Sequence, residues 1–112
     1  MSKEILLVAE AVSNEKGVDR GIIFEAIEQA LATATKKRYE EEADIRVDID
    51  RATGNYETFR RWTVMPDDHM AILGTEFTTE EAAEVDSSLQ IGDVHEEQIE
   101  NIDFADLRFV QS

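Results

Sequence analysis

The chain has 112 residues, a formal net charge of −15 and no cysteine, and 42% of its residues are hydrophobic. This length and apolar share predict a single domain (residues 1–112) with one core, and the lack of cysteine excludes disulfide scaffolds and thiol chemistry. No apolar run approaches the roughly 18–20 residues of a membrane span, and the first residues do not form a signal peptide, so we expect a soluble, cytoplasmic protein that does not bind membranes.

The negative charge is distributed unevenly. Residues 1–62 carry 10 basic and 13 acidic residues, a balance of −3, whereas residues 63–112 carry one basic residue and 13 acidic ones, a balance of −12. This acidity argues against a general nucleic-acid-binding protein, because phosphate contacts dominate such affinity. The first half still contains basic clusters that could face a polyanion, with solubility as the simpler explanation of the charge.

Two helices are predicted at the N-terminus. In residues 2–12 the apolar side chains recur on one face, and Gly17 suits the left-handed conformation that ends helices. A longer helix over residues 20–39 is capped by Asp19. The short connection makes the two helices an αα-hairpin. The apolar stripe of the longer helix comprises Ile23, Phe24, Ile27, Ala30, Leu31 and Ala34.

Two features of this hairpin are not required by packing. Leu6 and Leu7 lie off the apolar stripe of the first helix, so we expect one of them to be partly exposed or to contact another element. Lys36, Lys37 and Arg38 end the second helix and form the only run of three positive charges in the chain. Because cations stabilise helix C-termini, a purely structural role is the alternative for these three residues.

The periodicity changes to two after the hairpin. Residues 43–50 alternate apolar and charged side chains, which predicts a half-buried strand, and the turn at 51–55 leads into a return strand over 56–65. The apolar side chains of the return strand fall on both sides. Either a β-bulge near Arg60 and Arg61 or burial of both faces explains this pattern.

The facing of the strand arginines follows from strand geometry. Adjacent strand residues point to opposite faces, so at most one of Arg60 and Arg61 faces the core unless a bulge intervenes. Arg46 on the neighbouring strand would join the arginine that shares its face.

The second half of the sequence predicts shorter helices and strands. Residues 71–77 give a weak strand signal, Thr78 and Glu81 form a capping box that opens a short acidic helix to Asp86, and residues 94–99 read as a strand. Asp103 caps a last helix that the chain end truncates at Ser112. Its inward-facing side chains are expected to be Phe104, Leu107 and either Phe109 or Val110. The predicted fold is therefore α+β, with the N-terminal αα-hairpin packed on one face of a small, mainly antiparallel sheet.

No enzymatic site, cofactor or metal is predicted. The chain has no phosphate-binding loop and no nucleophile motif, and its two histidines, His69 and His95, occur in unrelated contexts. Residues 48–54 resemble a calcium loop only superficially, since Ala52 occupies a ligand position. We therefore expect a binding function.

Four stretches of the chain occur in the same order, and with similar spacing, in a known family. They resemble the N-terminal domain of the bacterial transcription factor NusA over about residues 1–65, with weaker similarity at 92–93 and 97–99. The stretches are Lys3-Glu4-Ile5-Leu6, Glu10-Ala11-Val12-Ser13-Asn14-Glu15-Lys16, Ala30-Leu31-Ala32-Thr33-Ala34-Thr35-Lys36-Lys37 and Thr58-Phe59-Arg60-Arg61-Trp62.

The resemblance implies a non-catalytic domain of a transcription elongation, termination and antitermination factor. Such a domain docks on the flap-tip helix of the RNA polymerase β subunit and supports pause and terminator RNA hairpins. Family members continue into an OB-type barrel and two KH modules, so this chain is expected to be the polymerase-binding domain alone, without the downstream RNA-binding domains, and a monomer.

Candidate residues follow from combining this resemblance with the pattern of the chain. Leu6 and Leu7 supply the exposed apolar anchors that helix-in-groove binding to the flap tip needs. The cations expected to face an RNA hairpin, weakly and mainly within the polymerase complex, are Lys36, Lys37, Arg38, Arg46, Arg60 and Arg61. The alternative function is an acidic α+β protein-interaction domain with no nucleic-acid role, and binding of a flap-tip peptide distinguishes the two.

Overall fold

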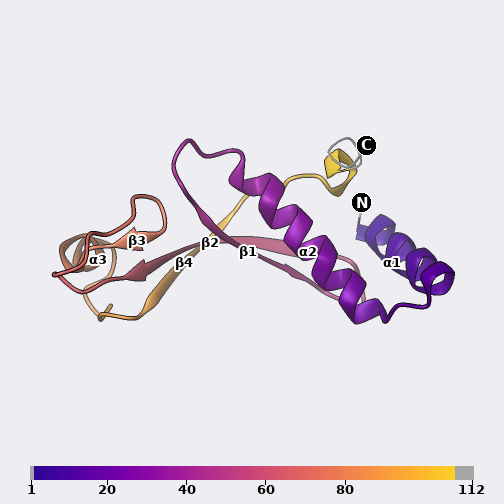
Figure 1. The fold of residues 1–112 in the computed structure, drawn as a ribbon, viewed down its shortest axis with the longest axis horizontal. Helices are drawn as coiled ribbons and strands as arrows, with labels where there is room; N and C mark the ends of the chain where they lie inside the picture. The colour runs from indigo at the N-terminus through magenta and orange to yellow at the C-terminus, as the bar shows by residue number, and fades with distance from the viewer. Residues whose placement is uncertain (1, 108–112) are drawn as a thin grey trace.

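The computed structural model describes residues 2–107, and residues 1 and 108–112 lie outside the described part. The molecule is elongated, with extents of 51 × 26 × 22 Å (Figure 1). Its elements are helices α1 (Ser2–Lys16), α2 (Arg20–Lys36) and α3 (Thr79–Val85), strands β1 (Asp44–Ile49), β2 (Tyr56–Val64), β3 (Glu76–Phe77) and β4 (Val94–Ile99), and the 3-10 helix η1 (Phe104–Asp106).

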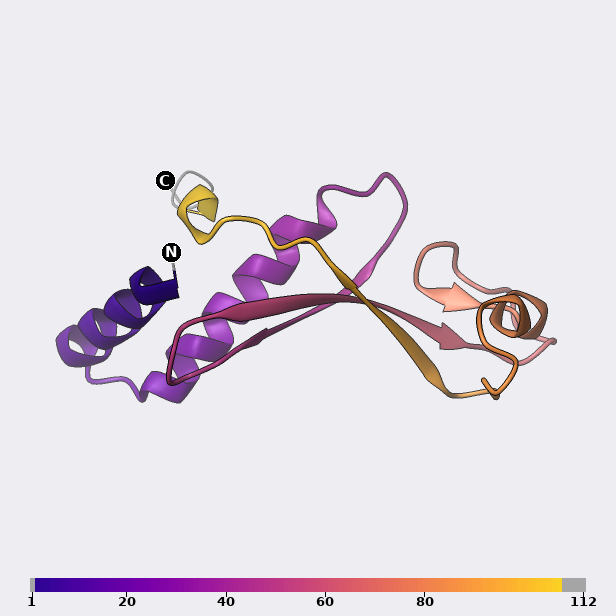
Figure 2. The same cartoon turned by 180° about the vertical axis from the view of Figure 1, so that it is seen from behind.

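Strand β2 is the centre of the sheet. It pairs antiparallel with β1 and with β4, and its C-terminal end pairs in parallel with the short strand β3. Helix α2 lies along one face of the sheet, and α1 packs beside α2 at one end of the molecule, while α3 and β3 lie at the other end (Figures 1 and 2). The predicted α+β fold, with an αα-hairpin and a mainly antiparallel sheet, is confirmed.

The core lies between α2, α1, β1 and the C-terminal segment. Asp19 caps α2 as predicted, since its carboxylate accepts a hydrogen bond from the Gly21 N–H. Four of the six residues in the predicted stripe belong to the buried core, and the other two, Ala30 and Ala34, pack against it. The largest buried side chains of the core include Ile5 from α1, Phe24 and Leu31 from α2, and Phe104 and Leu107 from the C-terminal segment.

Two helix boundaries differ from the predicted ones. Helix α1 extends beyond the predicted residue 12 to Lys16, and Gly17 then ends it with a φ of +66°. Helix α2 ends at Lys36, and residues 37 and 38 form a turn rather than a continued helix. Polar residues close to a helix end can extend or terminate it at similar cost, so such boundaries are poorly determined by sequence.

The strand predicted over residues 71–77 is wrong except for its last two residues. Residues 72–75 form a turn in which the Thr75 and Glu76 N–H groups both donate to the Ile72 carbonyl. Gly74 adopts a φ of +97°, and a Cβ atom there would lie 1.9 Å from the Glu42 carbonyl oxygen. The close approach of this turn to the α2–β1 connection therefore ends any strand before residue 76.

Strand β2 contains no bulge in its paired part. Its register runs without interruption from Tyr56 to Arg61 against β1 and from Thr58 to Thr63 against β4. Most of its side chains are half-buried on both faces. The bulge alternative is therefore wrong, and partial burial of both faces accounts for the distribution of apolar residues.

The C-terminal segment is held by a hydrogen-bonded tyrosine. The Tyr56 hydroxyl donates to the Ile102 carbonyl and accepts from the Phe104 N–H. Phe104 and Leu107 are buried as predicted, and Asp103 caps η1. The rest of the predicted last helix, with Phe109 and Val110, lies outside the described residues.

Replacing Tyr56 by Phe is expected to lower the free energy of unfolding by about 1–2 kcal/mol, because both hydrogen bonds are lost. Burial raises the pKa of Tyr56 in the folded state. The contribution of Tyr56 to the free energy of unfolding is therefore complete below the ordinary tyrosine pKa. It declines as the pH rises above about 10, because the unfolded chain then loses the hydroxyl proton more readily than the folded protein does. Urea denaturation at pH 8 and at high pH tests this, and a difference between parent and variant that grows with pH contradicts it.

Among residues 2–107, no helix combines the length and the apolar character needed to cross a membrane.

Candidate interaction surfaces

The two leucines of α1 differ in exposure. Leu7 is 67% exposed, whereas Leu6 is half-buried and packs against the core cluster. Ile5 and Ala9, which flank them in the sequence, are fully buried against the rest of the fold. Because consecutive helical residues point in different directions, α1 buries one stripe and presents Leu7 to solvent. The expectation that one leucine is exposed is confirmed for Leu7.

The basic run Lys36, Lys37 and Arg38 lies at the C-terminal end of α2, away from α1 (Figure 1). All three side chains are exposed, and no ion pair involves them within the described part of the chain. Arg38 Nη1 donates to the Glu100 carbonyl at 2.8 Å, which holds this turn beside the end of β4. The three positive charges are therefore free to attract an anion.

Arg46 and Arg61 lie on the sheet face opposite α2 and share one carboxylate. Arg46 donates two hydrogen bonds to Glu96, at 2.8 and 3.1 Å, and Arg61 Nε lies 3.1 Å from the same carboxylate. The Arg46 hydrogen bonds hold the pKa of Glu96 below its ordinary value. Arg46 also stacks over the Phe59 ring at 4.4 Å. Glu96 thus offsets one of the two positive charges of this pair.

Arg60 points to the α2 side of the sheet, since its register partner is the buried Ile45. Its guanidinium lies 4.4 Å from the Tyr39 ring centroid and 4.7 Å from that of Trp62. Nη2 donates to Glu41 and to the Gly74 carbonyl, each at 3.1 Å. With a side chain only 12% exposed, Arg60 joins the α2–β1 connection to the 72–75 turn.

The six predicted cations therefore do not form one basic patch. The sheet separates Arg60 from Arg46 and Arg61, and the three strand arginines all contact carboxylates. The exposed run at residues 36–38 is the part of the predicted set that has no ion-pair partner among the described residues. The sequence could not have revealed this, because Glu41 and Glu96 reach the arginines from other elements.

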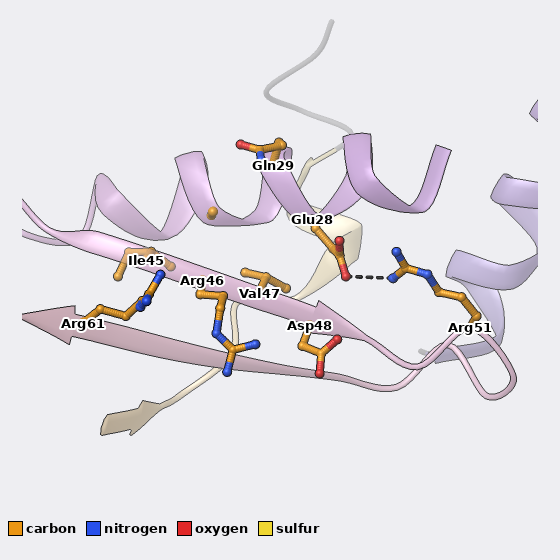
Figure 3. A pocket seen from close by; sticks show the side chains of 9 residues that line it. Glu28, Gln29, Ile45, Arg46, Val47, Asp48, Arg51 and Arg61 are labelled. Atoms are coloured by element: carbon orange, nitrogen blue, oxygen red, sulfur yellow. Dashed lines mark hydrogen bonds and ion pairs between the residues drawn. The ribbon is translucent and has the colours of Figure 1, made fainter. Parts of the chain in front are cut away.

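A polar groove of about 410 Å³ runs along β1 beside α2 (Figure 3). At one end the Glu28 carboxylate accepts hydrogen bonds from Arg51 Nη1 at 2.7 Å and from the Ile49 N–H at 2.9 Å. This interaction was not predicted from the sequence, where an acidic residue next to an apolar helical stripe was the only signal for it. The lining residues are Glu28, Gln29, Ala32, Ile45, Arg46, Val47, Asp48, Arg51 and Arg61.

Within residues 2–107, no group of three or more His, Cys, Asp or Glu side chains is arranged to hold a metal ion. His69 pairs with Glu76 at 3.1 Å and His95 with Glu97 at 3.0 Å, so each histidine has one carboxylate partner in the described part of the chain.

Comparison with known proteins shows which family the chain resembles. The chain matches the model of the family described as "NusA N-terminal domain" over residues 4–108. It is 36% identical over 104 residues to the transcription termination/antitermination protein NusA of Bacillus subtilis (strain 168), and the match covers 93% of this chain and 28% of that protein. The protein of the same name from Rickettsia conorii is 34% identical over 104 residues, covering 91% of this chain and 20% of that protein.

A solved structure agrees with these matches. The solution structure of the N-terminal domain of NusA from B. subtilis superposes on this structure with a TM-score of 0.67 and is 33% identical in sequence. The match covers 99% of this chain and 90% of that chain. The chain thus spans between a fifth and three tenths of the length of the full-length relatives that it matches.

Proposed function

Because the chain belongs to the NusA N-terminal domain family, a family of transcription factors, we propose that it is the polymerase-binding domain of a transcription elongation, termination and antitermination factor. In this role it acts by binding, without catalysis or cofactor, in the cytoplasm as a monomer. The observation that carries the proposal is the pair of separated features on the αα-hairpin: an exposed leucine on α1, and at the end of α2 a basic run with no ion-pair partner among residues 2–107.

The proposed polymerase contact is made by α1. Leu7 is exposed beside a half-buried Leu6, so a short amphipathic helix such as the flap tip of the β subunit gains apolar contact there without disturbing the core. Burial of exposed leucine surface is the main source of affinity for such helices. Leu7 is the anchor and Leu6 extends the apolar surface beneath it.

Replacing Leu7 by Ser is expected to weaken binding of a flap-tip helix peptide about tenfold or more while the fold is retained, since the side chain is an exposed contact rather than a core residue. Titration of the 15N-labelled domain with the peptide, followed by NMR, measures this. Ile91→Ser is the matched control, because Ile91 is similarly exposed but lies before β4, away from α1. Equal affinities for the Leu7 and Ile91 variants would falsify docking on α1.

The proposed RNA contact is made by Lys36, Lys37 and Arg38. Backbone phosphates of a hairpin are recognised by charge and shape, so a few free cations suffice without base-reading side chains. The strand arginines are assigned a structural role in this proposal, because carboxylates already pair with each of them. With a net charge of −15, the contact is weak in the isolated domain and becomes effective only beside the RNA, when the domain is held on polymerase.

The alternative function, an acidic protein-interaction domain without a nucleic-acid role, predicts a different result for the titration with the flap-tip peptide. A domain of that kind leaves the flap-tip peptide unbound and gives no response to RNA in the polymerase complex. Binding of the peptide at residues 3–10 together with a pausing effect supports the first function against the second.

A further inference from the structure

The loop between β2 and β3 presents a second set of exposed apolar side chains. Met70 is 90% exposed, Leu73 is 71% exposed and Ile72 is 47% exposed, and the loop continues into the turn that precedes β3. We refer to residues 70–73 as the apolar loop. It lies on the far side of the sheet centre from α1, so it is separate from the surface assigned to the flap tip (Figure 1).

Hydrogen bonds hold the backbone of the apolar loop in one conformation. Glu76 Oε1 accepts a hydrogen bond from the Ile72 N–H at 2.9 Å and lies 3.1 Å from His69 Nε2. The Ile72 N–H and, secondarily, His69 keep the pKa of Glu76 below its ordinary value, so the carboxylate stays charged. Arg60 donates to the Gly74 carbonyl, and the Thr63 N–H donates to the Thr75 carbonyl. The apolar side chains are therefore presented to solvent by an ordered backbone, which lowers the entropic cost of binding.

A hollow adjoins the loop. Leu73 forms one wall of a space of about 510 Å³ whose other walls are Arg38, Tyr39, Glu40 and Glu41 from the α2–β1 connection. The surface thus combines exposed anchors with an open concavity of the kind that receives a partner's side chains.

The charge around the loop selects the partner. Residues 65–94 contain eight carboxylates and no lysine or arginine, and Glu40 and Glu41 add two more beside the hollow; of these, Glu76 is paired with His69 and Glu41 with Arg60. Two cations also lie here: Arg38 lines the hollow and belongs to the basic run assigned to RNA, and Arg60, which pairs with Glu41, donates to the Gly74 carbonyl. Asp67 and Asp68 disfavour anionic RNA at the loop itself, whereas a protein segment with lysine or arginine around an apolar face complements these carboxylates. Like-charge repulsion likewise disfavours an acidic protein partner.

We propose that the apolar loop, with its acidic surroundings, is a second docking surface, which binds a basic, apolar-faced segment of a protein partner. This surface is independent of the proposed flap-tip contact on α1, so the domain can hold two protein segments at once. Met70 and Leu73 are the anchors, and the carboxylates around them accelerate the encounter and fix its polarity.

The test uses two synthetic helical peptides of about 14 residues, one built of Leu and Lys and the other of Leu and Glu with the leucines at the same positions. NMR titration of the 15N-labelled chain with the Leu/Lys peptide is expected to shift the amides of residues 67–76 and 38–41. The Leu/Glu peptide is expected to leave them unchanged. Because Met70 and Leu73 are exposed, the double variant Met70→Ser, Leu73→Ser retains the fold and is expected to raise the Kd of the Leu/Lys peptide about tenfold or more.

Ile22→Ser is the matched control, since Ile22 is 56% exposed on α2 and should leave this Kd unchanged. The proposal is overturned if the double variant binds like the parent, if the shifts follow the acidic face of α3 instead, or if the Leu/Glu peptide binds equally well. Binding of a single-stranded RNA oligonucleotide at the loop overturns it as well. Since none of these readouts involves Leu7 or the flap-tip peptide, failure here leaves the proposed polymerase contact untouched.

Discussion

Replacement of Leu31 by Ala is expected to lower the free energy of unfolding by about 2–5 kcal/mol, the range for truncating a leucine in a packed core. Leu31 lies in the middle of α2, is only 1% exposed and belongs to the core that α2 forms with α1, β1 and the C-terminal segment. The truncation removes apolar surface from this cluster and leaves a cavity that the surrounding side chains fill only partly. For a domain of this size, such a loss lowers the melting temperature by well over ten degrees at the upper end of the range.

Ile22→Ala supplies the control on the same helix. Ile22 is on the exposed side of α2, so its truncation removes little buried surface and changes stability by less than about 0.5 kcal/mol. Urea denaturation followed by circular dichroism compares the two variants under identical conditions. If Leu31→Ala unfolds at the same denaturant concentration as the parent, α2 is not the principal packing element of the fold.

Local patterns predicted the elements that depend on neighbours in the sequence. The stripe of α2, the cap at Asp19, the alternation in β1 and the capping box at Thr78 were all readable, because each rests on spacing within a few residues. The capping box is present with both reciprocal hydrogen bonds, from Glu81 N–H to Thr78 and from the Thr78 N–H to the Glu81 carboxylate.

The errors arose where residues distant in the sequence decide the outcome. Residues 71–75 carry apolar side chains typical of a strand, yet Gly74 must pass close to the Glu42 carbonyl, and this contact depends on the placement of α2. The facing of Arg60 and Arg61 required the pairing register with β1, which no local pattern specifies.

The candidate site shows the same division. An exposed leucine on α1 and a basic run at the end of α2 were predictable from helical periodicity. The neutralisation of the strand arginines was not, because Glu41 precedes β1 and Glu96 lies on β4. Six cations that look equivalent in the sequence therefore divide into three that contact carboxylates and three that have no ion-pair partner among the described residues.

The double charge reversal Lys36→Glu, Lys37→Glu is expected to abolish most of the proposed effect of the domain on hairpin-dependent pausing, while the proposed polymerase binding is retained. Both lysines are exposed at the end of α2, and neither has an ion-pair partner within the described residues, so the substitutions remove no contact of the fold. Their cost to stability is limited to an unfavourable interaction with the helix dipole, about 0.3–1 kcal/mol for each charge.

The expected loss of RNA binding by the double variant is much larger than this loss of stability. Three phosphate contacts give a log–log salt dependence with a slope of only about −2 to −3, so the contact depends on high local RNA concentration and on each of its charges. In the proposed complex with polymerase, the parent would meet the hairpin at an effective concentration that solution binding cannot reach, whereas the variant would present two carboxylates to the same phosphates and repel them.

Measurement of pause lifetimes at a hairpin-dependent site, with polymerase binding of each protein verified separately, tests this expectation. Arg46→Glu is the informative comparison: it breaks the contact with Glu96 on the opposite sheet face, and its pausing effect should remain close to that of the parent because Arg46 is assigned no RNA contact. If the lysine variant prolongs pauses as the parent does while bound to polymerase, Lys36 and Lys37 only stabilise the end of α2. If Arg46→Glu instead loses the effect, the RNA lies against the open sheet face and the assignment of the cations must be reversed.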